Sequence, residues 1–308
     1  MKILITGASG LVGHNISDTL AVKGYDLLLP KHHQLDLIDY STVLNFLERN
    51  HPDMIIHCAG RVGGIQANIK EPVRFLVDNI DMGRNVIMAA YKTGVPRLLN
   101  FGSSCMYPRN APNPLKEEMI LQGELEPTNE GYAIAKIMAQ RLCSYIVKEN
   151  PALRYKTLMP CNLYGKYDKF DLAHAHMIPS AINKIHAAKQ ENSDVLIWGT
   201  GNVRREFMYA GELAECVGYC IEEFDRMPEV LNVGIESDYT INEYYEAVAE
   251  VIGYKGKFIH DEAKPEGMKQ KLVDVTKLNA FGWKSSISLH EGIERTYKYF
   301  LETIRSGE

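Results

Sequence analysis

Three side chains in the first half of the chain have the types and spacing needed for proton transfer to a carbonyl. Tyr132 and Lys136 are four residues apart, which places both on one face of a helix. A phenol with an ordinary pKa of about 10 needs a neighbouring cation to act as an acid at neutral pH, and Lys136 can provide it. Ser103, at the end of a predicted strand, would hydrogen-bond the same carbonyl. The pattern predicts ketone reduction; a core tyrosine and a surface lysine on an amphipathic helix are the alternative.

A thiol and an imidazole are candidates for a second kind of chemistry. Cys105 lies in the stretch GSSCMYP (102–108) and follows Ser103 by two residues, which would put both on one side of an extended strand. His176 lies at the start of a predicted helix. A thiol of pKa about 8.5 and an imidazole of about 6.5 can both exchange protons at pH 7. From the residues alone, Cys105 could equally be a small buried hydrophobe, and His176 a helix cap or a core residue.

The elements that position these residues alternate between strands and helices. Helices are predicted at 11–22, 40–50, 72–94 and 131–149, and strands at 2–6, 25–29, 53–59, 97–104 and 154–160. This order predicts an α/β fold of the Rossmann type, a doubly wound parallel sheet with helices on both faces.

After Gly165 the rhythm changes and predicts a smaller α/β lobe. Its elements are helices at 176–188 and 240–254 and a strand at 194–198, while 230–234 and the closing helix at 288–304 are candidates to return to the sheet. We expect a nucleotide-binding domain over 1–164, a mainly substrate-binding lobe over 165–270, and a closing segment over 271–308.

A glycine-rich turn follows the first strand. TGASGLVG (6–13) places glycines at 7, 10 and 13, for a tight turn, a close approach to a pyrophosphate and close helix packing, with the phosphates at the helix N-terminus. The second predicted strand ends without a carboxylate and is followed by Lys31, His32 and His33, which favours NADP(H); a solvated basic turn is the alternative. The predicted cofactor contacts are Gly7, Ser9, Gly10, Leu11, Val12, Gly13, Lys31, His32, Asp36, Leu37, Ala59, Gly60, Phe101 and Gly102.

Composition restricts the possible partners. The chain has 308 residues, 45% of them apolar and 24% charged, with a net charge of −5. It contains no basic run for a nucleic acid or an anionic membrane, and no apolar run long enough to span a bilayer. The six cysteines form no C-x-x-C pair, which favours a reducing cytoplasm over a disulfide framework or a zinc site. We therefore expect a cytoplasmic enzyme that acts on a small molecule and holds no metal.

The combined motifs resemble the extended short-chain dehydrogenase/reductase family and, within it, the GDP-L-fucose synthases. The longer strings that carry the second resemblance cover most of the chain: GSSCMYP, RVGGIQAN (61–68), LQGELEPTNEGYAIAK (121–136), MPCNLYG (159–165), HMIPSAI (176–182) and WGTGNVRREF (198–207). The resemblance implies an NADPH-dependent 3,5-epimerase and 4-reductase of a GDP-4-keto-6-deoxy sugar, assembled as a homodimer.

The resemblance also implies roles for individual residues. Ser103, Tyr132 and Lys136 match the reductase triad, and Cys105 and His176 match the base and the acid of epimerisation. Cofactor contacts extend to Lys136, Asn162, Leu163 and His176, and substrate contacts are Asn162, Lys184, Trp198, Arg205 and Glu266, where the family usually has Asp.

The chain also departs from the family pattern. Ala8 and Ser9 replace larger polar or basic residues, and Gly131 replaces the usual Pro before Tyr132. Two alternatives stay open: a C4 reductase of another GDP-4-keto sugar, such as a heptose, with one epimerisation or none, and a nucleotide-binding protein without turnover.

Overall fold

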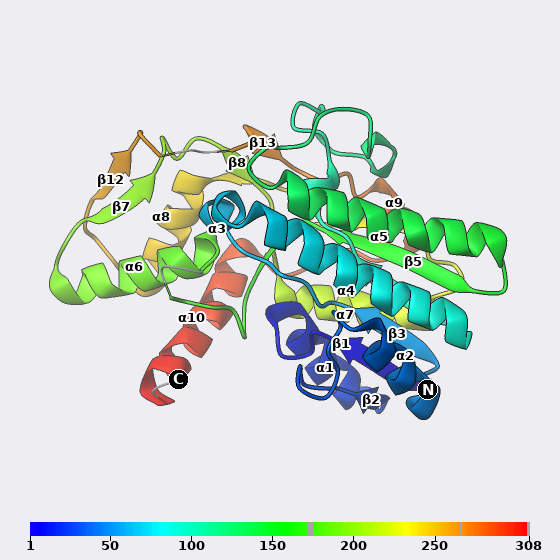
Figure 1. Ribbon diagram of the computed structural model, residues 1–308. Coiled ribbons are helices and arrows are strands. Elements are labelled where there is room, and N and C mark those ends of the chain that lie inside the picture. Colours follow the sequence, from blue (N-terminus) through cyan, green and yellow to red (C-terminus); the bar gives the residue numbers. More distant parts are fainter. Residues whose placement is uncertain (172–174, 265–266, 307–308) are drawn as a thin grey trace.

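A central parallel sheet organises the chain (Figure 1). The structure is a computed structural model that describes residues 1–171, 175–264 and 267–306. The six strands lie in the order β10-β5-β4-β3-β1-β2. Their bounds are β1 Lys2–Thr6, β2 Asp26–Leu28, β3 Met54–His57, β4 Arg97–Phe101, β5 Arg154–Pro160 and β10 Val230–Val233. The predicted Rossmann-type fold is confirmed.

Helices cover both faces of this sheet and bury its Val, Ile and Leu side chains in two core clusters. One face carries α2 (Tyr40–Asn50), α4 (Pro72–Thr93) and α5 (Glu130–Glu149), and the other carries α1 (Leu11–Val22), α7 (Ala210–Glu222) and α9 (Thr276–Phe281). Burial on both sides explains why the strands read as continuous apolar runs. The short helix α3 (Ile65–Lys70) precedes α4.

A second lobe lies beside the sheet, on the left in Figure 1. Helices α6 (Met177–Glu191), α8 (Ile241–Ile252) and α10 (Leu289–Ser306) share one apolar cluster with strand β7 (Val195–Trp198), which pairs with β12 (Phe258–Asp261). The predicted helix after residue 239 is confirmed, because Thr240 and Glu243 form a capping box and Gly253 ends the helix in the left-handed region.

Short strands join the lobe to the ends of the main sheet. They are β6 (Asn162–Tyr164), β8 (Arg204–Arg205), β9 (Phe207–Tyr209), β11 (Tyr239–Thr240) and β13 (Gln270–Lys271), and they pair as β6-β9 and β11-β8-β13. Segments 230–233 and 210–222 return to the Rossmann part as β10 and α7, so the second lobe is not continuous in sequence. The proposed domain boundaries stay a prediction.

Two expectations about element bounds and packing are wrong. The strand expected over 97–104 ends at Phe101, and Ser104–Met106 forms a 3-10 helix, because the Ser103 hydroxyl accepts a hydrogen bond from the Cys105 N–H at 3.2 Å and turns the chain. The closing helix α10 packs in the second lobe against α8 and β9 rather than returning to the sheet.

Candidate active site

The glycine loop has the geometry for a bound pyrophosphate. Gly7 has φ of +71°, and a Cβ there would lie 2.8 Å from the backbone of Ala59. A Cβ at Gly13 would lie 2.3 Å from the Gly7 carbonyl oxygen, so this position also requires glycine. Gly10 precedes the first turn of α1, where no side chain caps the helix and no acidic residue occurs. The N–H groups of Leu11, Val12 and Gly13 at this turn therefore suit an anion.

The other predicted cofactor residues lie at the carboxyl ends of the neighbouring strands. Lys31 and His32 are exposed after β2, where the extra phosphate of NADP(H) would lie. Asp36 is also exposed, whereas Leu37 is only 8% exposed and belongs to the core, so its contact with adenine stays a prediction. The remaining predicted contacts follow β1, β3 and β4: Ser9, Ala59, Gly60, Phe101 and Gly102.

The structure brings the predicted reductase triad together. Lys136, on α5, is 7% exposed, and its ammonium group donates a 2.8 Å hydrogen bond to the Phe101 carbonyl at the end of β4. The same nitrogen lies 5.8 Å from the centre of the Tyr132 ring. Burial lowers the pKa of Lys136 to about 8. Burial raises the pKa of Tyr132, the charge of Cys105 raises it further, and a hydrogen bond with Ser103 lowers it. The phenol is thus a proton donor at neutral pH.

The Cys105 thiol lies beside this triad, for a different reason from the one expected. It belongs to the 3-10 turn that Ser103 caps, so the same-side argument for an extended strand is wrong. Two donors approach its sulfur, Asn129 Nδ2 at 3.2 Å and Lys271 Nζ at 3.7 Å. Lys271 is 8% exposed. A buried ammonium group therefore lies within reach of the Cys105 sulfur.

The sequence interpretation missed Asn129 and Lys271 as candidate site residues. Asn129 lies three residues before Tyr132, inside a string already singled out, and could have been found there. Lys271 comes from β13, 166 residues after Cys105, and no local signal marks it.

His176 lies in the second lobe, at the start of α6. It is the N-cap residue of α6, but its side chain makes no capping hydrogen bond, so the capping interpretation is wrong. Its Nδ1 lies 3.8 Å from Oδ1 of Asp168, a carboxylate that the sequence interpretation also missed. His176 is 41% exposed, so it is open to a ligand.

Two of the predicted substrate residues, Lys184 and Trp198, lie together in the second lobe. Trp198, at the end of β7, is 50% exposed, and the ammonium groups of Lys184 and Lys264 lie 5.5 Å from its ring. Burial lowers the pKa of Lys184. An exposed indole flanked by two cations suits a nucleobase and its phosphates. Glu266, the remaining predicted substrate contact, lies outside the described residues.

Asn162 and Leu163 lie on β6 and Arg205 lies on β8, among the short strands at the end of the main sheet. Asn162 donates from N and from Nδ2 to the Glu206 carbonyl, at 3.2 Å and 2.9 Å. The Glu206 carboxylate is fully buried and accepts backbone N–H bonds from Ile235, Glu236 and Val273. Burial raises the pKa of Glu206 to about 7, against the effect of these three donors. This carboxylate ties the strands that carry Arg205 and Lys271 to the end of β10.

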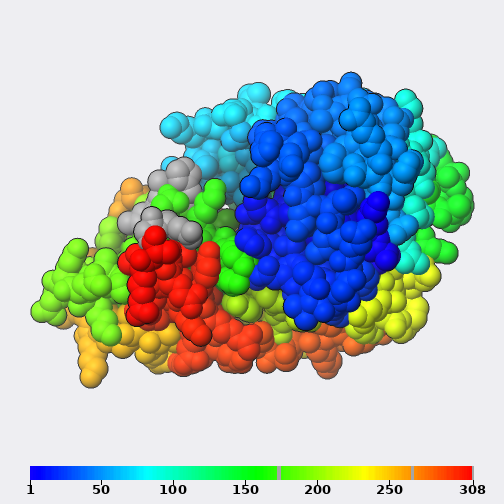
Figure 2. Space-filling view, turned by 90° about the horizontal axis from the view of Figure 1, so that it is seen from below, coloured from blue at the N-terminus to red at the C-terminus, as the bar shows by residue number. Residues whose placement is uncertain are grey.

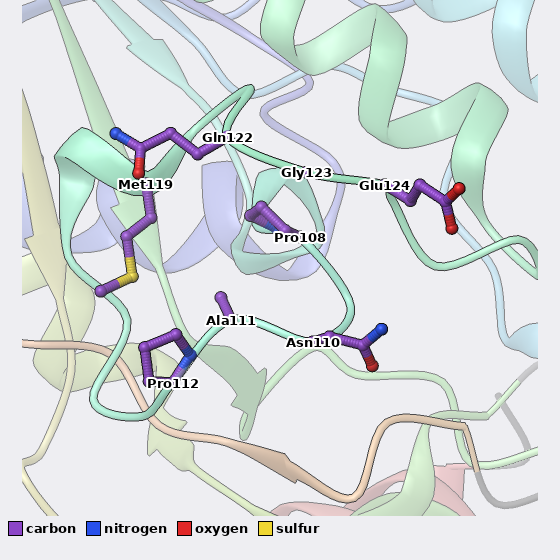
Figure 3. A pocket seen from close by; sticks show the side chains of 8 residues that line it. All are labelled: Pro108, Asn110, Ala111, Pro112, Met119, Gln122, Gly123 and Glu124. Carbon is purple, nitrogen blue, oxygen red and sulfur yellow. The ribbon is translucent and has the colours of Figure 1, made fainter.

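Two hollows lie on the surface around the Rossmann part of the chain. One, of 230 Å³, is lined by residues of α3, α4 and the start of α5, including Asn129 and Tyr132. The other, of 410 Å³, is formed by the loop that follows the 3-10 helix Ser104–Met106, and Figure 3 shows Pro108, Ala111, Pro112 and Met119 around it. No candidate catalytic residue lines the second hollow, so it is a feature of the surface loop.

Within residues 1–171, 175–264 and 267–306, no group of three or more His, Cys, Asp or Glu is arranged to hold a metal ion. None of the helices in the described part of the chain is long and apolar enough to cross a membrane.

Residues 3–234 match the NAD dependent epimerase/dehydratase family, and the chain belongs to that family. It is 51% identical over 302 residues to the GDP-L-colitose synthase of Yersinia pseudotuberculosis, covering 98% of each chain. It is 45% identical to the GDP-L-fucose synthase of Azorhizobium caulinodans, covering 97% of this chain and 96% of that one.

A similar solved structure is a GDP-D-glycero-L-gluco-heptose synthase from Campylobacter jejuni in the presence of NADPH. Its TM-score is 0.91 at 29% identity, with coverage of 97% of this chain and 98% of that chain. The fold and the sequence comparisons therefore agree on enzymes of GDP-sugars.

Proposed function

We propose that the protein is an NADPH-dependent 3,5-epimerase and 4-reductase of a GDP-4-keto-6-deoxy sugar, of the GDP-L-fucose synthase type. The main support for the proposal is that a triad suited to ketone reduction lies next to a thiol suited to proton transfer. The triad of Ser103, Tyr132 and Lys136 can reduce a ketone, and the Cys105 thiol lies beside it with Lys271 at 3.7 Å. The identity with the synthases of GDP-L-colitose and GDP-L-fucose supports the substrate class.

Reduction uses the triad. The Ser103 and Tyr132 hydroxyls hydrogen-bond the C4 ketone oxygen, and Tyr132 gives its proton to that oxygen as the alcohol forms. The Lys136 ammonium offsets the charge that remains on the phenolate. The glycine loop and the cations after β2 would hold NADPH, which would supply the hydride for C4.

Epimerisation uses the same oxygen site and the second pair of groups. Carbons 3 and 5 both flank the C4 ketone, so loss of a proton from either gives an enolate that Ser103 and Tyr132 can stabilise. Cys105, as thiolate, removes the proton and becomes the thiol, while protonated His176 returns a proton to the opposite ring face. The two groups exchange protons with water afterwards, and no net redox change occurs.

A C4 reductase of a GDP-heptose is the second candidate. The similarity to a GDP-heptose synthase at a TM-score of 0.91 favours it. Within the first proposal, the 51% identity to a GDP-L-colitose synthase keeps the colitose nucleotide as an alternative product to GDP-L-fucose.

Solvent deuterium distinguishes these candidates. The enzyme is incubated with a GDP-4-keto-6-deoxy sugar in D₂O, with and without NADPH, and product mass and ring stereochemistry are followed. We expect deuterium at carbons 3 and 5, and loss of this uptake in Cys105→Ser with direct C4 reduction retained. Reduction without deuterium at either carbon would reject the epimerase activity and leave the reductase, and binding without turnover would reject both.

We expect a cytoplasmic homodimer. Helices α4 and α5 lie side by side on one face (Figure 1) and expose Val73, Val77, Ile134 and Tyr145 by 41–70%. An apolar surface of this kind suits a second copy of the chain. Sedimentation should show a dimer that Ile134→Glu dissociates, and a wild-type monomer would reject the expectation.

A further inference from the structure

Asp168 places a carboxylate beside the imidazole of His176. Its Oδ1 lies 3.8 Å from His176 Nδ1, and the Asp168 side chain is 4% exposed whereas that of His176 is 41% exposed. The separation is longer than a hydrogen bond, but a small rotation of the imidazole would bring the two atoms within hydrogen-bond distance.

The Asp168 carboxylate is poorly paired for a buried charge. Oδ1 accepts a 2.9 Å hydrogen bond from the Lys169 N–H, and Oδ2 accepts none from the residues that the structure describes. A buried carboxylate without enough donors is costly to maintain. The Nδ1–H of His176 is a donor close enough to offset part of that cost after a small rotation of the ring.

Tyr167, the residue before Asp168, is held in a strained backbone conformation. Tyr167 has φ of +71°, a region that residues with a side chain seldom adopt. Its ring stacks on His14 at 3.5 Å, its hydroxyl donates to Asp18 at 2.7 Å, and Tyr299 of α10 contacts it edge-on. Figure 2 shows α10, in red, close to the blue N-terminal segment. The Asp168 loop is thereby fastened to α1, the helix that opens at the glycine loop.

We propose that Asp168 is a positioning residue for His176. It accepts a hydrogen bond from Nδ1–H when the sugar is bound, which leaves Nε2 as the atom that passes the proton to the sugar. This inference rests on the proposed epimerase function, because that function requires His176 to act as an acid. Nothing in the motif pattern assigned a role to Asp168.

Three variants test the inference through uptake of solvent deuterium by the keto sugar without NADPH. Asp168→Asn removes the charge, Asp168→Glu retains it, and Asp18→Asn removes a charge that fastens the same loop without facing His176. We expect Asp168→Asn to lower kcat for uptake about 10- to 100-fold with KM within about threefold, Asp168→Glu to recover most of the rate, and Asp18→Asn to stay within about threefold of wild type. A wild-type rate in Asp168→Asn, or an equal loss in Asp18→Asn, would overturn the proposal.

A spectroscopic measurement separates this inference from the proposed function. The ¹⁵N shifts of the His176 ring, assigned by difference with His176→Gln, report which nitrogen carries the proton. In the ternary complex with NADP⁺ and the GDP-sugar, we expect Nδ1–H in wild type and loss of this preference in Asp168→Asn. A wild-type enzyme that takes up no deuterium would reject the epimerase function alone, whereas an Nε2–H tautomer in wild type, or the same spectrum in both proteins, would reject the role of Asp168.

Discussion

The two halves of the candidate site are built in different ways. Tyr132 and Lys136 lie on α5, and Lys136 is fixed by the Phe101 carbonyl at the end of β4. Ser103 follows β4 by two residues, as the N-cap of the 3-10 turn. Cys105, Lys271 and His176 come from a 3-10 turn, a two-residue strand and a helix N-cap in separate parts of the chain. The reductase half is therefore set by local structure, whereas the acid–base half depends on tertiary contacts between the lobes.

The difference predicts that single substitutions can damage one half and spare the other. The largest effect is expected for Lys136→Met, because it removes the cation beside Tyr132 and keeps a side chain of similar length. NADPH-dependent reduction should fall about 10³-fold or more, while deuterium uptake without NADPH should fall less, since Cys105 and His176 remain.

Lys148→Met is the matched control, because Lys148 lies on the same helix α5 and is exposed. It should leave both activities at the wild-type level. Equal losses of reduction and uptake in Lys136→Met would show that the two halves do not work separately.

The second largest effect is on the pH dependence of stability, through the Glu206 carboxylate that joins the strands of the acid–base half. The pKa of Glu206 is raised from 4.5 to about 7, so the folded protein holds this proton more tightly than the unfolded chain. The stability from this group is complete below pH 4.5 and is lost as the pH rises through 7, on the order of 3 kcal/mol. Glu206→Gln cannot titrate and should lack this part of the pH dependence.

The measurement is thermal unfolding of wild type, Glu206→Gln and Glu215→Gln between pH 4.5 and 8. Glu215 is an exposed carboxylate on α7 and serves as the control. The deficit of Glu206→Gln relative to wild type should shrink as the pH rises through this window. A constant deficit would contradict the raised pKa of Glu206.

The sequence was sufficient for the parts of the site that follow from local rules. The β1–glycine loop–α1 unit, the Y-x-x-x-K spacing and the capped helix α8 each depend on residues close together in the chain, and the structure bears out those elements. The predicted end of β4 was wrong because a serine hydroxyl can cap a turn in place of the next strand hydrogen bond. The alternation of residue types along a strand does not reveal such a cap.

The missed residues show where local rules stop. Lys271 reaches Cys105 only because Glu206 accepts the Val273 N–H and because β13 pairs with β8. Asp168 faces His176 only because Tyr167 is fastened to α1. Both contacts depend on how the lobe is attached to the sheet, which single-chain patterns do not encode.

Lys271→Met should have a smaller effect than Lys136→Met, and on the other half of the site. Without the ammonium at 3.7 Å, the Cys105 thiolate loses its neighbouring cation but keeps the Asn129 hydrogen bond. Deuterium uptake should fall about 10- to 100-fold, with direct C4 reduction changed by less than about fivefold. Lys269→Met, an exposed neighbour, is the control. A greater loss of reduction than of uptake would assign Lys271 to the reductase half.

The smallest effect is a pH dependence that again concerns only the reductase half. Burial lowers the pKa of Lys136 to about 8, so the ammonium is present below pH 8 and is lost above it. Because reduction needs the charged form, kcat/KM for NADPH-dependent reduction should decline about tenfold per pH unit above 8. Lys136→Arg keeps its charge at these pH values and should lack the decline in whatever activity it retains. A wild-type profile that stays level up to pH 9.5 would show that Lys136 remains charged and would contradict its lowered pKa. The hydrogen bond to the Phe101 carbonyl would then offset the burial of Lys136.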